Sequence, residues 1–233
     1  MSSTPAPEST TTESRRISSL FGNVELIIVI MLGIVSVVTA YASFQAALYG
    51  SKMDSFYAQS TRLTAEAESA YLEGNQQYVQ DAATIARLLE LQVEAESPDP
   101  QLAALAVEKL DVLSFVSVSD ELAAAIEWSD AENEADPDFY TPPQNDDAYL
   151  ESLFGGWSAL NDEAAAATTS GDEANTYGDR LTLNTVLFAV SLFLLGVGAV
   201  LKSRRAQYAL ISVSTAIFLG GLALTVTIPF VSL

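Results

Sequence analysis

Three long apolar segments are separated by polar stretches in this chain of 233 residues. They begin near Val24, Leu181 and Tyr208, and only the first contains a charged side chain, Glu25. A helix of roughly 20 apolar residues is long enough to cross the ~30 Å hydrocarbon core of a bilayer. The pattern therefore predicts an all-α integral membrane protein with transmembrane helices at residues 24–50, 181–201 and 208–230.

The long polar segment between the first two spans, residues 51–180, has helical periodicity and no convincing strand alternation. No proline occurs between Pro7 and Pro98, so we expect one helix to run from about Val24 to Glu96. The rest of this segment is predicted to hold two short helices, at 101–113 and 121–133, and then a proline-containing loop at 135–147. A final helix is predicted from about residue 147 onward, and Gly155-Gly156 can interrupt it.

Small residues recur along the first span at spacings of three and four, which places them on one helix face with a seven-residue period. We call this set the small-residue seam; it comprises Gly33, Ser36, Ala40, Ser43, Ala47 and Gly50. Helices in lipid associate by close packing across small residues. The seam is therefore predicted to be a helix–helix contact face. Its register continues to the stripe Tyr71, Tyr78, Ala82, Ile85 and Leu89, which we expect to pack within its own domain.

Charge is divided very unequally along the chain. The sequence has 30 acidic and 10 basic side chains and a formal net charge of −20, yet 49% of its residues are hydrophobic. Residues 51–180 hold 27 of the acidic and five of the basic side chains. The acidity thus belongs almost entirely to one helical domain outside the spans.

Basic residues beside the spans predict the orientation in the membrane. Arg15-Arg16 precede the first span, and Lys202, Arg204 and Arg205 lie in the predicted turn 202–207. Because such residues favour the cytoplasmic side, the N-terminus and this turn are expected inside. The acidic domain and the C-terminus are then extracytoplasmic, as in a multi-pass plasma-membrane protein.

The N-terminal region allows two interpretations. Residues 1–19 are rich in Ser, Thr and Pro, which predicts a disordered cytoplasmic tail. Arg15-Arg16, the apolar run and Ala40-Tyr41-Ala42 also fit a secretory signal that is cleaved. The helical pattern that continues past residue 42 favours a retained span.

The composition excludes several classes of site. The chain has no cysteine and no histidine, which excludes thiolate nucleophiles, Ser-His-Asp triads and zinc sites that use either residue. Its negative charge argues against nucleic acid. Acidic residues alternate from Asp130 to Asp138, but no EF-hand glycine or glutamate follows. We expect a solvated loop with at most weak cation binding there, and no metal site or cofactor.

A short motif follows the first span: Tyr41, two residues, Phe44-Gln45-Ala46 and then Tyr49. The motif, with the order of helical segment, two-span hairpin and basic turn, resembles an uncharacterised family of prokaryotic three-span membrane proteins. The resemblance implies this topology and no known activity. It singles out Gln45 as a polar candidate at the membrane edge, for which hydrogen bonding to a neighbouring helix is favoured over ligand binding.

These observations favour a non-enzymatic membrane scaffold or accessory subunit that associates through its first transmembrane helix. Its expected partners are the bilayer and either further copies of itself or another membrane protein. The alternative is a homo-oligomeric ion channel with an acidic extracytoplasmic vestibule and a pore lined by Ser36, Thr39, Ser43 and Gln45. A carboxylate hydrolase acting outside the cell is a third, less favoured hypothesis.

Overall fold

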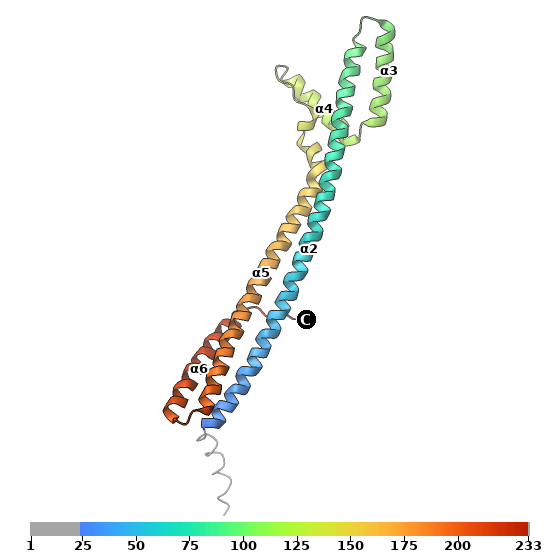
Figure 1. The fold of residues 1–233 in the computed structure, drawn as a ribbon. Coiled ribbons are helices and arrows are strands. Elements are labelled where there is room, and N and C mark those ends of the chain that lie inside the picture. The colour runs from blue at the N-terminus through green and yellow to red at the C-terminus, as the bar shows by residue number, and fades with distance from the viewer. Residues whose placement is uncertain (1–23, 233) are drawn as a thin grey trace, which may run out of the picture. The chain divides into compact units, whose positions relative to one another are not determined.

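The computed structural model describes residues 24–232, and within that range it contains helices and no strands (Figure 1). The elements in chain order are α2 (Val24–Ala95), α3 (Pro100–Ser117), α4 (Asp120–Ala135), the short 3₁₀ helix η1 (Pro143–Asn145), α5 (Asp147–Val200) and α6 (Arg204–Val226). Helices α2, α5 and α6 are long and apolar enough to cross a membrane. The all-α prediction is confirmed. The predicted tail 1–19, with Arg15 and Arg16, lies outside the described residues.

Several predicted helix limits differ from the structure, and α6 already begins at Arg204, inside the predicted turn 202–207. Helix α5 continues through Gly155 and Gly156, because glycine in a helix interior costs only about 1 kcal/mol and packing along the helix offsets it. Helix α6 ends at Val226, four residues before the predicted limit. Pro229 explains this early end, since proline disfavours helical conformation in the residue before it.

Side-chain caps mark the starts of α3 and α4. The Asp99 carboxylate accepts a hydrogen bond from the Gln101 backbone N–H at 2.9 Å, and Pro100 occupies the first helical position of α3. Ser119 caps α4 by accepting from the Leu122 N–H at 3.2 Å. The predicted helices 101–113 and 121–133 therefore exist, each slightly longer than expected.

The described chain divides into two compact units, and each contains part of α2 and part of α5. Unit 1 comprises residues 24–55 and 170–232, and unit 2 comprises residues 56–169. Unit 1 contains α6, whereas unit 2 contains α3, α4 and η1.

Unit 1 has an apolar core formed by three helices. Its buried side chains come from the first part of α2, the second part of α5 and α6, and they are Val24, Ile28, Val35, Ala42, Phe188, Leu195 and Phe218. Gly221 of α6 lies against the Phe188 ring, and a Cβ there would come within 2.8 Å of it. Glycine at this position thus permits close approach of α5 and α6.

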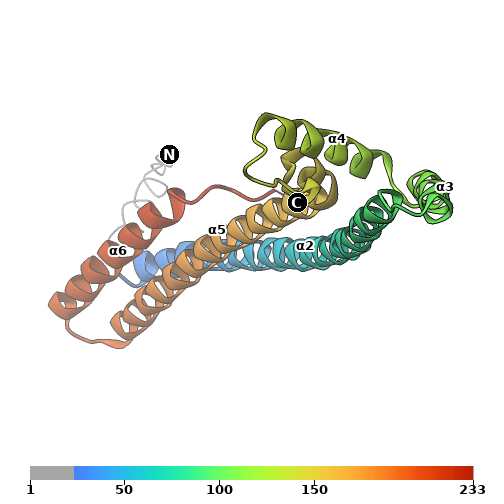
Figure 2. The ribbon, with the colours of Figure 1, turned by 90° about the horizontal axis from the view of Figure 1, so that it is seen from above.

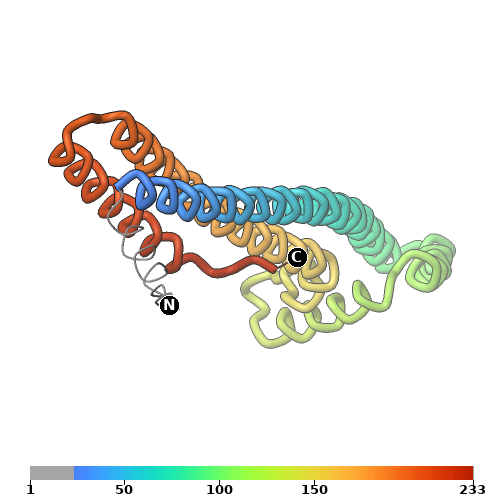
Figure 3. The backbone as a smooth tube through the Cα atoms, turned by 90° about the horizontal axis from the view of Figure 1, so that it is seen from below, coloured from blue at the N-terminus to red at the C-terminus, as the bar shows by residue number. Residues whose placement is uncertain are grey.

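Polar side chains inside unit 1 pair across the α5–α6 hairpin, whose turn at residues 201–203 is visible in Figure 3. The hydroxyls of Ser191 and Ser214 lie 2.7 Å apart, and the Asn184 amide donates to Thr225 Oγ1 at 3.0 Å. Interhelical hydrogen bonds of this kind satisfy groups that lipid cannot. They hold the two helices of the hairpin in one register.

Unit 2 has its own core where α2, α4 and α5 meet. Ile85, Leu122, Ala125 and Tyr149 form its buried cluster. Figures 1 and 2 show α3 folding back beside the last turns of α2. Elsewhere in unit 2, a Cβ on Gly74 would overlap the Leu153 carbonyl oxygen of α5, so the close contact of α2 and α5 requires glycine there.

A buried polar pair joins α2 to the start of α5 within unit 2. The Tyr149 hydroxyl donates to Asp81 Oδ2 at 2.7 Å, and the Gln77 amide donates to Asp81 Oδ1 at 2.8 Å. Asp81 and Tyr149 are only 1% and 2% exposed. Burial, followed by the hydrogen bond to Asp81 and its negative charge, raises the pKa of Tyr149 above its ordinary value of 10.0.

We predict that Tyr149→Phe lowers the free energy of unfolding of unit 2 by about 1–3 kcal/mol, because it removes a partner from a buried acceptor. Both tryptophans of the chain, Trp128 and Trp157, belong to unit 2, so denaturation followed by tryptophan fluorescence reports on this unit. Tyr71→Phe is the matched control, since Tyr71 is 44% exposed. Equal losses in the two variants would contradict the prediction.

The same variant has an expected pH signature. A tyrosine whose pKa is higher in the folded state stabilises the fold fully below its unfolded pKa, and this contribution is lost as the pH rises above about 10. Wild-type unit 2 should therefore lose stability more steeply above pH 10 than Tyr149→Phe. Parallel stability curves for the two proteins would show that Tyr149 does not contribute.

Candidate association surface and membrane-edge clamp

The small-residue seam lies on the surface of unit 1 rather than in its core. Gly33, Ser36, Ala40, Ser43 and Ala47 are exposed, and Gly50 is half-buried. A Cβ on Gly33 or Gly50 would meet no neighbouring group within 4 Å. The seam is therefore not a packing face within the chain.

The buried face of α2 has the predicted seven-residue period but a different register. Its buried apolar positions at multiples of seven are Ile28, Val35, Ala42, Tyr49, Leu63 and Leu91. This register precedes the seam by one residue, and one residue turns a helix by about 100°. The stripe that continues the register of the seam is also only partly buried. Ile85 is buried, whereas Tyr71 and Leu89 are 44% and 46% exposed.

The exposed surface of the first span is itself divided into two stripes. Beside the seam, bulky side chains recur at spacings of three and four, and each is about half exposed or more; they are Ile30, Ile34, Val37, Tyr41 and Phe44. Bulky apolar side chains suit contact with lipid tails. Small side chains instead leave the helix backbone accessible to a second helix.

Gln45, the membrane-edge candidate, lies inside unit 1 at 3% exposure. Its amide nitrogen donates to the Val231 carbonyl at 3.3 Å, and its amide oxygen accepts from the Val231 N–H at 3.1 Å. The side chain thus pairs with both backbone groups of one residue, as a neighbouring β-strand would. The partner is the non-helical segment after α6 rather than a helix.

Tyr49 forms the second half of this clamp, one turn further along α2. Its hydroxyl donates to the Pro229 carbonyl at 2.7 Å, and its ring lies 5.3 Å from that of Tyr177. Ile228 and Val231 pack against the same apolar cluster, which includes Ala174 and Leu181. Gln45 and Tyr49 therefore bind the backbone of residues 229–231 and hold this segment against unit 1, and we call this arrangement the Gln45–Tyr49 clamp.

The remaining sequence candidates are not brought into one site. Glu25 is exposed at the start of α2. Thr39 donates to the Val35 carbonyl of its own helix at 2.7 Å. The alternating acidic residues from Asp130 to Asp138 lie on the exposed end of α4 and the following loop. Within residues 24–232, no group of acidic side chains is arranged to hold a metal ion.

Sequence reasoning missed the hydroxyl of Tyr49 and the pairing of Asn184 with Thr225. Tyr49 was visible as part of an aromatic motif, but its partner lies 180 residues away along the chain. No local pattern indicates such a contact. The seven-residue step from Ala42 to Tyr49 was the available signal that Tyr49 shares the buried face.

Comparisons with protein families, curated proteins and solved structures find no match for this chain. The resemblance to three-span prokaryotic membrane proteins therefore stays a prediction.

We predict that Gln45→Ala releases the segment after α6. The chain has no cysteine, so Val231→Cys provides a single labelling site while keeping the backbone groups that Gln45 binds. Its reaction with a water-soluble maleimide should become at least about threefold faster when Gln45 is replaced, because local opening exposes the thiol.

Gln59→Ala is the control for this experiment, since Gln59 is an exposed amide on the same helix. Equal labelling rates with and without Gln45 would show that the apolar contacts alone hold the segment.

Proposed function

We propose that this protein is a non-enzymatic integral membrane scaffold or accessory subunit that associates with another membrane helix through the small-residue seam. The observation that supports this most directly is the position of the seam. Its members do not pack inside the chain, so they are exposed without serving the fold. The exposed stripe beside the seam carries bulky side chains, so the small residues are confined to one face. A helix of a second copy, or of another membrane protein, can approach closely there.

The proposed orientation places the α5–α6 turn in the cytoplasm and unit 2 outside the plasma membrane. Lys202, Arg204 and Arg205 lie exposed at this turn, which supports an inside location. Unit 2 carries 23 acidic and three basic side chains, which suits a soluble domain exposed to water. The C-terminal segment then lies on the outer side.

The homo-oligomeric channel is the second candidate. Ser36 and Ser43 are exposed on one face and could line a pore between copies. Two other proposed lining residues are occupied elsewhere, since Gln45 binds Val231 and Thr39 binds Val35. The structure thus supports association through this face better than conduction along it.

We predict that the double substitution Gly33→Leu and Ala40→Leu disrupts association without unfolding unit 1, because neither position packs inside the chain. Crosslinking in native membranes should recover at least about fivefold less complex than for the wild type, since bulky side chains prevent close approach of a second helix. The enlarging control Val37→Phe, on the bulky stripe, should have little effect.

Recovery of only monomeric wild-type protein would contradict the proposal. Recordings of pure protein in planar bilayers distinguish the two candidates. A scaffold is expected to be silent across voltage, whereas reproducible conductance would favour the channel.

A further inference from the structure

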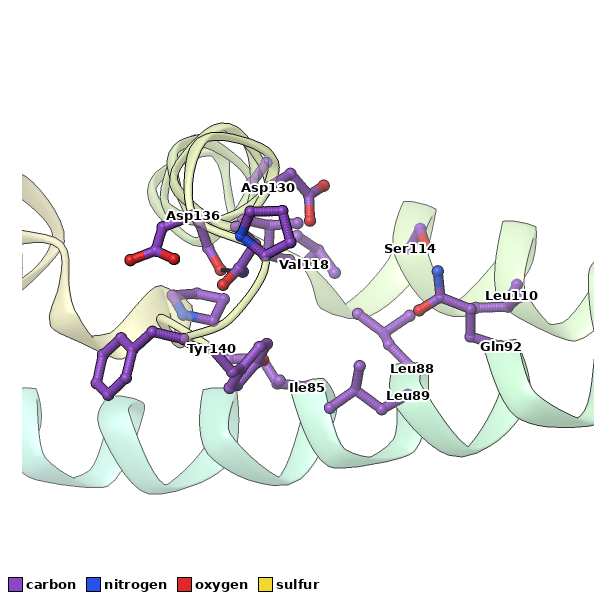
Figure 4. Close-up of a pocket in the computed structure, with 17 residues that line it drawn as sticks. Ile85, Leu88, Leu89, Gln92, Leu110, Ser114, Val118, Asp130, Asp136 and Tyr140 are labelled. Carbon is purple, nitrogen blue, oxygen red and sulfur yellow. Dashed lines mark hydrogen bonds between the residues drawn. The ribbon is translucent and has the colours of Figure 1, made fainter.

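Unit 2 contains a pocket of about 720 Å³ between α2, α3, α4 and the loop that follows α4 (Figure 4). Its volume lies within the range of roughly 300–1,000 Å³ that is typical of small-molecule sites. Figure 4 shows side chains from several elements converging on one space: Leu88 and Leu89 from α2, and Leu110 and Ser114 from α3. This pocket is independent of the seam and of the Gln45–Tyr49 clamp.

One wall of the pocket is held in place by a polar network. The Ser129 hydroxyl donates to the Thr141 carbonyl at 2.6 Å, and the Asn133 amide nitrogen donates to the same carbonyl at 3.1 Å. The Thr141 N–H donates back to Asn133 Oδ1 at 2.6 Å. These bonds fix the loop to α4, although its adjacent aromatic residues, Phe139 and Tyr140, are 68% and 59% exposed.

The lining combines apolar, aromatic and acidic side chains. Asp130 and Asp136 lie on the α4 side, across the pocket from Leu88 and Leu89 (Figure 4). Phe139 and Tyr140 also line the pocket, and no lysine or arginine is among its described lining residues. Carboxylates and aromatic faces both attract a cation, and the acidity of unit 2 adds to that attraction.

We propose that this pocket binds an organic cation with an apolar body. The positive charge lies beside Asp130 and Asp136, and the body contacts Leu88, Leu89 and Leu110. A bare metal ion fits the site poorly, because hard cations require several oxygen ligands and would leave the apolar walls uncovered. A molecule with both features satisfies the carboxylates and buries the apolar surface.

The test uses tetraphenylphosphonium as the probe and the full chain in nanodiscs of zwitterionic lipid. A selective electrode measures the free probe, and empty nanodiscs provide the background. We expect saturable binding at one site per chain. Tetraphenylborate, which has the same shape and the opposite charge, should not bind saturably, and tetramethylammonium, which lacks an apolar body, should bind at least about tenfold more weakly.

Two variants separate the pocket from the general acidity of unit 2. Ser114→Phe fills the apolar space without changing charge and should weaken binding at least about tenfold, since the probe loses its apolar contacts. The pair Asp130→Asn and Asp136→Asn should weaken binding by about tenfold. The control pair Glu132→Gln and Glu134→Gln removes the same charge from exposed positions of α4 that do not line the pocket, so its affinity should stay within about twofold.

Three outcomes would overturn the proposal: no saturable binding of the probe, binding that Ser114→Phe leaves unchanged, or equal weakening by the two acidic pairs. The tryptophan-monitored denaturation described above verifies that each variant remains folded. A variant that fails this check is replaced by Ser114→Leu, which also occupies the pocket and must weaken binding if the proposal is correct.

Discussion

The packing of α5 against one buried register of α2 determines which surfaces of the protein remain available. The register repeats every seven residues, the period of helices that pack side by side along their length. Unit 1 uses it through Ala42 and Tyr49, and unit 2 uses it through Leu63, while Gly74 lies off this register but against Leu153 of α5. The missing side chain at Gly74 allows close approach of α5. The rest of the α2 surface is partly covered by α3, α4, α6 and the segment after α6, and what remains, including the seam, is exposed.

The two buried polar side chains of α2, Gln45 and Asp81, are each committed to particular partners. Asp81 pairs with Tyr149 in unit 2, and Gln45 pairs with Val231 in unit 1. Apolar contacts alone tolerate small shifts along a helix, whereas a buried polar group without its partner is costly. The pairs therefore oppose sliding of one helix along another. These polar pairs therefore help to fix one alignment of the packed segments along α2, in addition to any gain in stability.

The helices were predictable from the sequence, but the faces they bury were not. Apolar length and the positions of Pro98 and Pro229 indicate where helices run and end. The seven-residue period of α2 is also visible, yet small residues occupy both its buried face and the seam, as Ala42 and Ala40 illustrate. Lipid is as apolar as a protein core, so hydrophobicity cannot distinguish the two faces. The unit 2 pocket was unpredictable because Leu88, Leu110 and Tyr140 meet only in the folded chain.

The Gln45–Tyr49 clamp has a consequence for biogenesis. Gln45 and Val231 are 186 residues apart, so the ribosome must add all of the intervening chain before their hydrogen bonds can form. Until then the Gln45 amide has to be hydrated or bonded elsewhere. The clamp is therefore among the last contacts of unit 1 that can form as the chain is synthesised.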